Sequence, residues 1–138
     1  MKKFVLEMLT PERRFFLGEA DSVVVKAVDG ETEILADHVP VVIALVPDMV
    51  RIRKDGETLF CANGEGFVTV DKDKVFILCQ TFEWPEEIEY ERVNRAIREH
   101  TEKMREATDT ADYRVSKMTI ARAMARLKVK ELKDNQKK

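Results

Sequence analysis

Short apolar runs alternate with turn residues through the first 85 positions of the chain, and all five glycines and all four prolines lie there. Frequent turns predict a sheet of short strands, whereas the stretch 86–138, without glycine or proline, can run as helix. The expected strands are 4–9, 22–28, 39–46, 50–53, 58–62, 67–70 and 75–82. Seven or more short strands predict an all-β sandwich or barrel and exclude parallel βαβ units.

The stretch 86–138 carries apolar residues at helical spacing. Pro85 suits a first helical turn because proline presets φ, and Glu86 and Glu87 suit the positive end of the helix dipole. The polar segment 108–112 predicts a turn, since its side chains compete for backbone hydrogen bonds. The expected apolar positions are Val93, Ala96, Ile97, His100, Met104 and Ala107 in the first helix, then Met118, Ala121, Ala125 and Leu132 on one face of the second, with Ile120, Met124 and Leu127 beside it.

Two helices joined by a short polar turn form an antiparallel α-helical hairpin. We therefore expect two units, a sandwich over residues 1–85 and a hairpin over residues 86–138. The hairpin buries little apolar surface by itself, so it should pack on the sheet or on a partner. Periodicity leaves open whether it is a lid that completes the core or a moving part.

Charge is distributed unevenly along the chain. Residues 110–138 carry nine basic and three acidic side chains, although the formal net charge of the whole chain is −2. A cationic helix on an otherwise acidic protein implies an acidic partner, such as a carboxylate-rich surface, a nucleotide phosphate or a nucleic acid. The longest apolar run, 39–46, is interrupted by Pro40 and is too short to span a membrane. No targeting segment is visible, so we expect a cytosolic protein or a peripheral part of something larger.

No catalytic or metal-binding arrangement is evident in the sequence. The glycine-rich stretch 63–66 is followed by no helix and no GK[ST], so it predicts a turn and not a phosphate cradle. Asp71 and Asp73 lack the glycine and distal glutamate of a calcium loop and predict a solvated hairpin. His38 and His100 have no histidine or cysteine at the spacing of a zinc site.

Two cysteines, Cys61 and Cys79, lie within apolar strand-like runs. They do not form a CxxC pair, and thiols in such runs are usually buried. We therefore expect reduced core thiols and no disulfide.

Five fragments fall in a characteristic order along the chain: Thr10-Pro11-Glu12, Asp29-Gly30-Glu31, residues 34–40 (ILADHVP), residues 64–68 (GEGFV) and residues 122–129 (RAMARLKV). In order, spacing and total length they resemble the epsilon subunit of the rotary F-type ATP synthase, whose mitochondrial counterpart is named delta. The resemblance covers essentially the whole chain. It implies a sandwich of about ten strands that binds the gamma subunit and the c ring, and a regulatory hairpin that inhibits ATP hydrolysis when extended.

The resemblance also implies contact residues for the other subunits. The turn containing Glu31, Thr32 and His38 corresponds to the edge that meets the c ring and the foot of gamma. Glu33 and the pair Ala36-Asp37 depart from the family pattern there. An acidic loop of the beta subunits is the implied partner of the cationic second helix, through Arg122, Arg126, Lys128 and Lys130.

A nucleotide site is implied by a second motif. Some bacterial members bind ATP on the folded hairpin through Ile/Leu-Asp-x-x-Arg-Ala, and this chain has Ile88, Glu89, Arg92 and Val93 at those positions. The positions of Glu83, Arg122 and Arg126 match further nucleotide contacts, and arginines on facing helices can hold phosphates bidentately. The alternative is a solvated i,i+3 pair between Glu89 and Arg92, without a ligand.

Taken together, the resemblance implies a non-catalytic subunit that couples proton translocation to ATP synthesis. Its partners would be gamma, the c ring, beta and alpha, and it would lie peripherally at the cytoplasmic face of a bacterial membrane. It requires no cofactor or metal, with ATP as a candidate regulatory ligand. The alternative function is a β-sandwich nucleic-acid-binding module that uses the basic C-terminal helix, although that helix has almost no aromatic residues for stacking.

Overall fold

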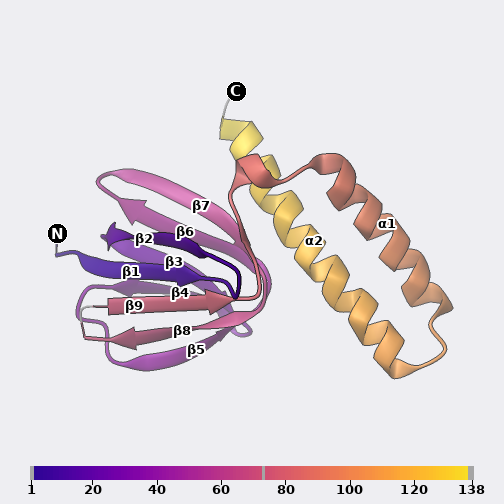
Figure 1. The fold of residues 1–138 in the computed structure, drawn as a ribbon, viewed down its shortest axis with the longest axis horizontal. Coiled ribbons are helices and arrows are strands. Elements are labelled where there is room, and N and C mark those ends of the chain that lie inside the picture. Colours follow the sequence, from indigo (N-terminus) through magenta and orange to yellow (C-terminus); the bar gives the residue numbers. More distant parts are fainter. Residues whose placement is uncertain (1, 73, 137–138) are drawn as a thin grey trace.

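The computed structural model describes residues 2–72 and 74–136 as a β-sandwich followed by two helices (Figure 1). Ten strands form two sheets of five, in the orders β2-β1-β9-β8-β5 and β10-β7-β6-β3-β4. The strands are β1 (Phe4–Leu9), β2 (Arg14–Ala20), β3 (Ser22–Ala27), β4 (Gly30–Leu35), β5 (Val41–Leu45), β6 (Asp48–Lys54), β7 (Glu57–Asn63), β8 (Gly66–Asp71), β9 (Lys74–Cys79) and β10 (Phe82–Glu83). A 3₁₀ turn, η1 (Pro85–Glu87), precedes α1 (Tyr90–Glu106) and α2 (Thr110–Gln136). The predicted fold class is therefore confirmed.

Alternation along the strands sends every second side chain into the space between the sheets. Leu6 and Met8 of β1, Val23 of β3 and Ile77 of β9 are fully buried there. Burial of such side chains is the main term that stabilises the sandwich, because each removes apolar surface from water. Cys61 and Cys79 are free and buried in the same core, as predicted.

Several strand limits differ from the prediction. The run 75–82 is two strands in different sheets, because the chain crosses between the sheets at residues 80 and 81. There Gln80 N donates to Glu65 O and Thr81 O accepts from Gly64 N, both at 2.9 Å. Strands β2 and β4 are not among the predicted strands, because their apolar runs are short: Phe15-Phe16-Leu17 in β2 and Ile34-Leu35 in β4. Strands β1 and β9 pair in parallel, but no helix lies between them in the described part of the chain, so the prediction that no parallel βαβ unit forms is confirmed there.

The turn prediction for residues 63–66 is confirmed, since β7 ends at Asn63 and β8 begins at Gly66. Asp71 ends β8 just before the turn to β9, whereas Asp73 lies outside the described residues.

The connection from sandwich to hairpin is fastened to β2. The ring of Phe15 stacks on Phe82 and Trp84, with centroids 5.1 and 4.4 Å away. The Arg13 guanidinium donates to both carboxylate oxygens of Glu87, at 3.1 and 2.9 Å. These contacts make the segment that follows β10 part of the sandwich surface.

The predicted helix start at Pro85 is wrong, because only the single turn η1 forms there and α1 begins at Tyr90. Between them, Ile88 and Glu89 are extended. The Ile88 side chain is only 3% exposed and packs between the sandwich and both helices. Burial of this side chain explains why the chain stays extended across the junction.

Helix α2 lies between α1 and the sandwich (Figure 1), where it contacts α1, β6, β7 and η1. The expectation that the hairpin packs on the sheet is confirmed. A second apolar cluster fills this junction, built from Met49, Phe60, Ala62, Ile88, Val93, Ala123 and Val129. The predicted stripe of α1 is also confirmed, since Val93 is buried and the other stripe residues are half-buried.

The predicted face of α2 is wrong in part. Met118 and Met124 are 37% and 50% exposed, whereas Ala123 and Val129 are buried. A helix with partners on two sides buries more than one stripe, so a single apolar face does not describe it. The inter-helix turn is also shorter than predicted, because the Asp109 carboxylate accepts from Asp112 N at 2.7 Å and starts α2 there.

Candidate functional site

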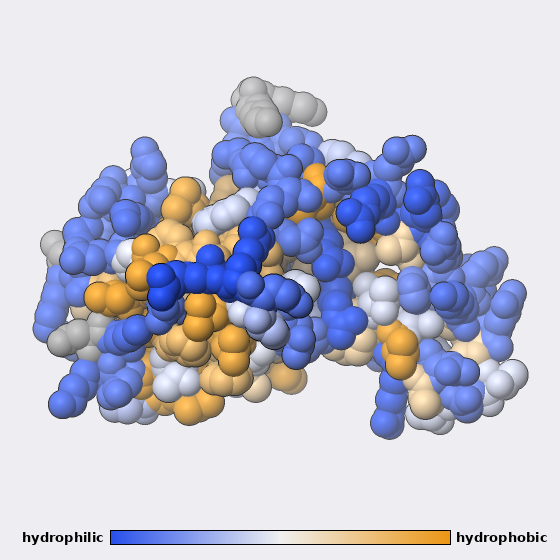
Figure 2. Space-filling view, in the orientation of Figure 1, coloured by the Kyte–Doolittle hydropathy of each residue, from blue (hydrophilic) through white to orange (hydrophobic). Residues whose placement is uncertain are grey.

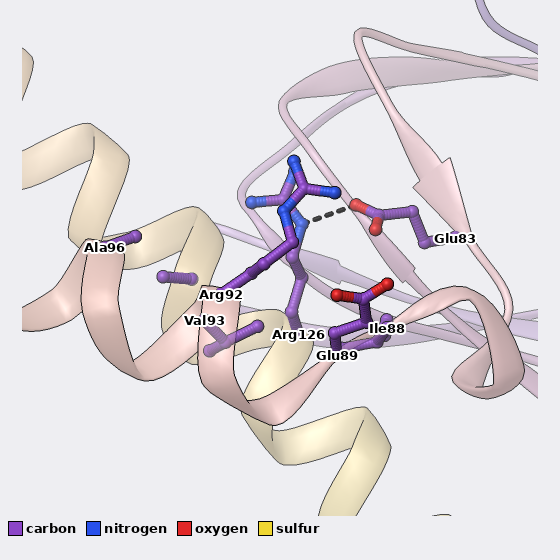
Figure 3. Close-up of a pocket in the computed structure, with 8 residues that line it drawn as sticks. Glu83, Ile88, Glu89, Arg92, Val93, Ala96 and Arg126 are labelled. Carbon is purple, nitrogen blue, oxygen red and sulfur yellow. Dashed lines mark hydrogen bonds and ion pairs between the residues drawn. The ribbon is translucent and has the colours of Figure 1, made fainter.

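A cavity of about 340 Å³ opens where β10, α1 and α2 meet (Figure 3). Its volume is at the lower end of the range for small-molecule sites. It is lined by Glu83, Ile88, Glu89, Arg92, Val93, Ala96, Ala123 and Arg126. Six of the seven residues predicted to contact a nucleotide line it, and the seventh, Arg122, does not. Two lining residues, Ala96 and Ala123, are not among the predicted contacts. Their sequence signals are weak: Ala96 lies on the predicted apolar stripe of α1, and Ala123 is a small side chain three residues before Arg126.

The cavity lining is charge-balanced. Arg126 of α2 donates to the Glu83 carboxylate, and both side chains are 27% exposed. Figure 3 shows Arg92, from α1, and Arg126 extending toward the side of the cavity where Glu83 lies. The predicted pair of Glu89 with Arg92 is not formed among the described residues. The cavity therefore has an arginine on each helix, of which only Arg126 is held by a carboxylate.

The remaining cations predicted to contact a beta subunit also face the sandwich. The Arg122 guanidinium donates to both oxygens of Glu65, at 2.9 and 2.8 Å. Lys128 Nζ lies 2.8 Å from the Asp48 carboxylate, and Lys130 Nζ donates to the Pro85 carbonyl at 3.2 Å. The cationic side of α2 is therefore bound to the body of the same chain in this structure.

Glu65 shows the electrostatic consequence most clearly. Its bidentate hydrogen bonds from Arg122 lower the pKa of the Glu65 carboxyl, and burial only partly opposes this shift. A carboxylate and a guanidinium in this geometry form one of the stronger surface contacts that proteins make. The ion pair joins α2 to the turn between β7 and β8.

Residues predicted to meet the c ring are placed differently from expectation. Glu31 and Thr32 lie on β4 and not in a turn, because they pair with Lys26 and Val25 of β3. His38 follows β4 in the connection to β5. Strand β4 is the last strand of its sheet. Its outer edge has unpaired backbone groups of the kind that another chain can contact.

The outer face of the sheet β2-β1-β9-β8-β5 exposes apolar side chains (Figure 2). Leu17 and Val42 are 51% and 68% exposed on it. Glu7 lies in the middle of this face, where Lys74 at 3.0 Å and Arg14 at 3.1 Å neutralise it and lower its pKa. An exposed apolar face with a satisfied ion pair is typical of a surface that another protein covers.

The sandwich matches the family model described as ATP synthase, Delta/Epsilon chain, beta-sandwich domain, over residues 3–85. The chain belongs to this family. The ATP synthase epsilon chain of Ruminiclostridium cellulolyticum is 42% identical over 92% of this chain and 95% of the relative. That of Caldanaerobacter subterraneus subsp. tengcongensis is 35% identical over 93% of this chain and 94% of the relative. The resemblance to the epsilon subunit is thus confirmed over both the sandwich and the hairpin.

Two cryo-EM structures share the fold. One chain of the Euglena gracilis mitochondrial ATP synthase (OSCP/F1/c-ring) superposes with a TM-score of 0.79 at 19% identity, over 89% of this chain and 78% of that chain. One chain of the Tetrahymena thermophila mitochondrial ATP synthase (central stalk/c-ring) gives 0.71 at 13%, over 94% and 97%. The arrangement of sandwich and hairpin therefore recurs in these two solved structures.

Neither helix within residues 2–72 and 74–136 contains an apolar stretch of the length that a membrane span requires. Nor do three His, Cys, Asp or Glu side chains gather there as a metal site would require.

Proposed function

We propose that the chain is a non-catalytic subunit of the central stalk of an ATP synthase, couples proton translocation to ATP synthesis, and inhibits ATP hydrolysis through its hairpin. Family membership supports the proposal that the chain is part of an ATP synthase complex. The observation that supports regulation is that α2 is held on the sandwich by exchangeable ion pairs. In this role the chain lies peripherally at the cytoplasmic face of a bacterial membrane.

The outer face of the sheet β2-β1-β9-β8-β5 is proposed as the surface for gamma. Monomeric proteins rarely leave a large contiguous apolar area in water, and burial of such area drives association. Leu17, Val42 and Phe67 are exposed there on three different strands. The opposite sheet is covered in part by α2, so the uncovered face is free for a permanent neighbour.

The edge strand β4 is proposed as the contact with the c ring and the foot of gamma. Glu31 is half exposed and held by Arg51 at 2.7 Å, which fixes its carboxylate on the outside of the sheet. His38 Nδ1 lies 2.9 Å from the Val39 carbonyl, so its ring is also positioned. Ordered polar side chains beside a sheet edge suit contacts with polar loops.

When the hairpin extends, its basic side chains are proposed to leave the carboxylates of the sandwich and to pair with carboxylates of a beta subunit. Arg122, Arg126 and Lys128 are each paired with a carboxylate of the sandwich. An acidic loop of a beta subunit offers the same chemistry, so the net difference between the folded and extended states is small and reversible. The pairing within the chain also leaves the folded hairpin without an open basic stripe, which disfavours the nucleic-acid alternative.

ATP is proposed as a ligand of the cavity between β10, α1 and α2. Arg92 is the available guanidinium for a phosphate, and Arg126 becomes available if it leaves Glu83. A ligand that contacts all three elements binds only when the hairpin is folded, and therefore favours that state. ATP would then reduce inhibition.

Assembly tests the stalk role. Leu17→Asp with Val42→Asp should abolish co-purification with gamma, because two charges would be buried at the interface. Val115→Asp is the matched control, since Val115 is 65% exposed on α2, away from that face. Equal recovery of gamma with both variants would contradict the proposed surface.

Hydrolysis tests the regulatory role. A chain ending at Ile88 keeps the Arg13–Glu87 ion pair and should still assemble, while ATP hydrolysis by the complex rises. The double variant Lys128→Ala/Lys130→Ala removes contacts from both the folded and the extended state, so hydrolysis should change less than on truncation while its dependence on salt falls. Identical hydrolysis by parent, double variant and truncated complexes across a salt series would exclude the hairpin from inhibition.

Nucleotide binding is tested separately by calorimetry on the isolated chain. Arg126→Ala should weaken ATP binding at least about tenfold, since a charge-assisted contact contributes about 1.5–3 kcal/mol. Absence of heat and of NMR shift changes at millimolar ATP would contradict the nucleotide site and leave the stalk role intact.

A further inference from the structure

Arg122 is the arginine that the family resemblance assigns to a nucleotide and that the structure places outside the cavity. Both of its hydrogen bonds go to Glu65, and the two side chains are 36% and 29% exposed. Glu65 does not line the cavity. Glu65, which lies outside the proposed nucleotide site, therefore holds an arginine that was expected to contact the nucleotide.

The backbone at Glu65 belongs to the sandwich and is fixed there. Glu65 O accepts from Gln80 N, and Gly64 N donates to Thr81 O. A side chain at Gly66 would meet the main chain of Leu78 at 2.0 Å, so this turn is packed tightly on its neighbour. This turn stays with the sandwich if α2 moves. The bidentate contact of Arg122 with Glu65 must therefore break before the guanidinium can bind another anion in the same way.

Arg122 lies within reach of the cavity once it is released. Arg126 follows it by four residues on α2, so the two side chains project from neighbouring turns of one helical face. Arg126 and Ala123 already line the cavity. From these positions we expect a rotation of the released Arg122 side chain, without movement of α2, to bring its guanidinium toward the cavity rim.

Release of Arg122 from Glu65 would change the net charge of the side chains around the cavity. The ionisable residues that line the cavity are Glu83, Glu89, Arg92 and Arg126, two of each sign. A polyphosphate bound among groups that sum to zero gains little from long-range attraction. A third guanidinium would give the site a net positive charge and a bidentate phosphate contact.

We infer that Glu65 sets the affinity of the cavity for nucleoside triphosphates by competing with phosphate for Arg122. This inference rests on the proposed function of the cavity as an ATP site. Without nucleotide, Glu65 holds Arg122 and helps to keep α2 folded. With nucleotide, the phosphates must displace the Glu65 carboxylate from Arg122. The parent chain therefore binds ATP more weakly than a chain in which Arg122 is not held by Glu65.

The test is an ATP titration of the full chain by calorimetry, with Glu65→Gln as the central variant. Glutamine keeps the shape of the side chain but removes its charge, so affinity should rise roughly tenfold, as for the gain of one charge-assisted contact. Glu57→Gln is the matched control, because it changes the net charge equally on the exposed part of β7 and should leave affinity unchanged.

A double variant identifies the arginine responsible. Glu65→Gln combined with Arg122→Gln should bind ATP no better than Arg122→Gln alone. The Arg122 Nε–H resonance should also shift when ATP is added to the parent chain. Amide exchange of α2, measured without nucleotide, checks that each variant keeps the hairpin folded.

Each outcome decides the question. If the parent binds ATP and Glu65→Gln binds equally or more weakly with α2 still folded, the inference is wrong and the ATP site stands. If Glu65→Gln binds and the parent does not, the inference is supported in its strongest form. If neither binds, the ATP site itself is wrong and the inference fails with it.

Discussion

Replacement of Val129 by alanine should loosen the hairpin and leave the sandwich intact. Val129 is fully buried where α2 meets the sandwich, in the cluster that includes Met49, Phe60 and Ile88. Val129→Ala removes two methyl groups, each with about 0.8 kcal/mol of transfer free energy, and leaves a small cavity. Docking of α2 should therefore weaken by about 2 kcal/mol.

Native-state amide hydrogen exchange measures this effect by region. A loss of about 2 kcal/mol corresponds to roughly 30-fold faster exchange for amides that open with the hairpin. These are the amides of α1 and α2. Amides of Leu6, Val23 and Ile77, in the core of the sandwich, should keep their rates because their opening does not involve Val129.

Met124→Ala is the matched control, since Met124 is 50% exposed on the same helix. Its removal should change exchange by no more than about twofold, equivalent to about 0.5 kcal/mol or less. Uniform acceleration of helix and core amides in Val129→Ala would mean that hairpin and sandwich open as one unit. The hairpin could then not detach from an intact sandwich, contrary to this prediction.

Three further outcomes follow from local geometry. Gly66→Ala should lower the unfolding free energy by roughly 3 kcal/mol or more, because its Cβ would overlap the main-chain oxygen of Leu78 in β9. Gly18→Ala should cost under about 1 kcal/mol in thermal unfolding, because its Cβ would meet only side chains, the flexible end of Lys54 at 3.0 Å and the Phe16 ring at 3.4 Å. The lowered pKa of Glu65 contributes stability that is present above the usual glutamate pKa of about 4.3 and lost as pH falls through the lowered pKa. Acid should thus release α2 in NMR spectra, and Glu65→Gln should reduce this pH dependence. Burial raises the pKa of Cys79 to about 12 and that of Cys61 further, so neither thiol should react with iodoacetamide at pH 8 before unfolding; rapid labelling of the native chain would contradict this.

Features that depend on short-range chemistry could be predicted from the amino-acid sequence. The confinement of glycine and proline to the first 85 residues separated sheet from helix, because those residues act on the local backbone. The stripe of α1 could be predicted from spacing because α1 packs mainly on one element, α2. Six cavity residues could be named in advance because they lie in matched motifs, five of them between Glu83 and Val93.

Features that depend on partners distant in sequence could not be predicted and are visible only in the folded chain. The buried positions of α2 follow from its place between α1 and the sandwich, which a single helical period does not encode. Ile88 stays extended because its side chain is buried in a cluster built from both units. The partners of Arg122, Arg126 and Lys128 are Glu65, Glu83 and Asp48, which come from three separate parts of the sandwich. Charge composition shows that a cationic helix needs an anion, but only folding brings a particular carboxylate within hydrogen-bonding distance.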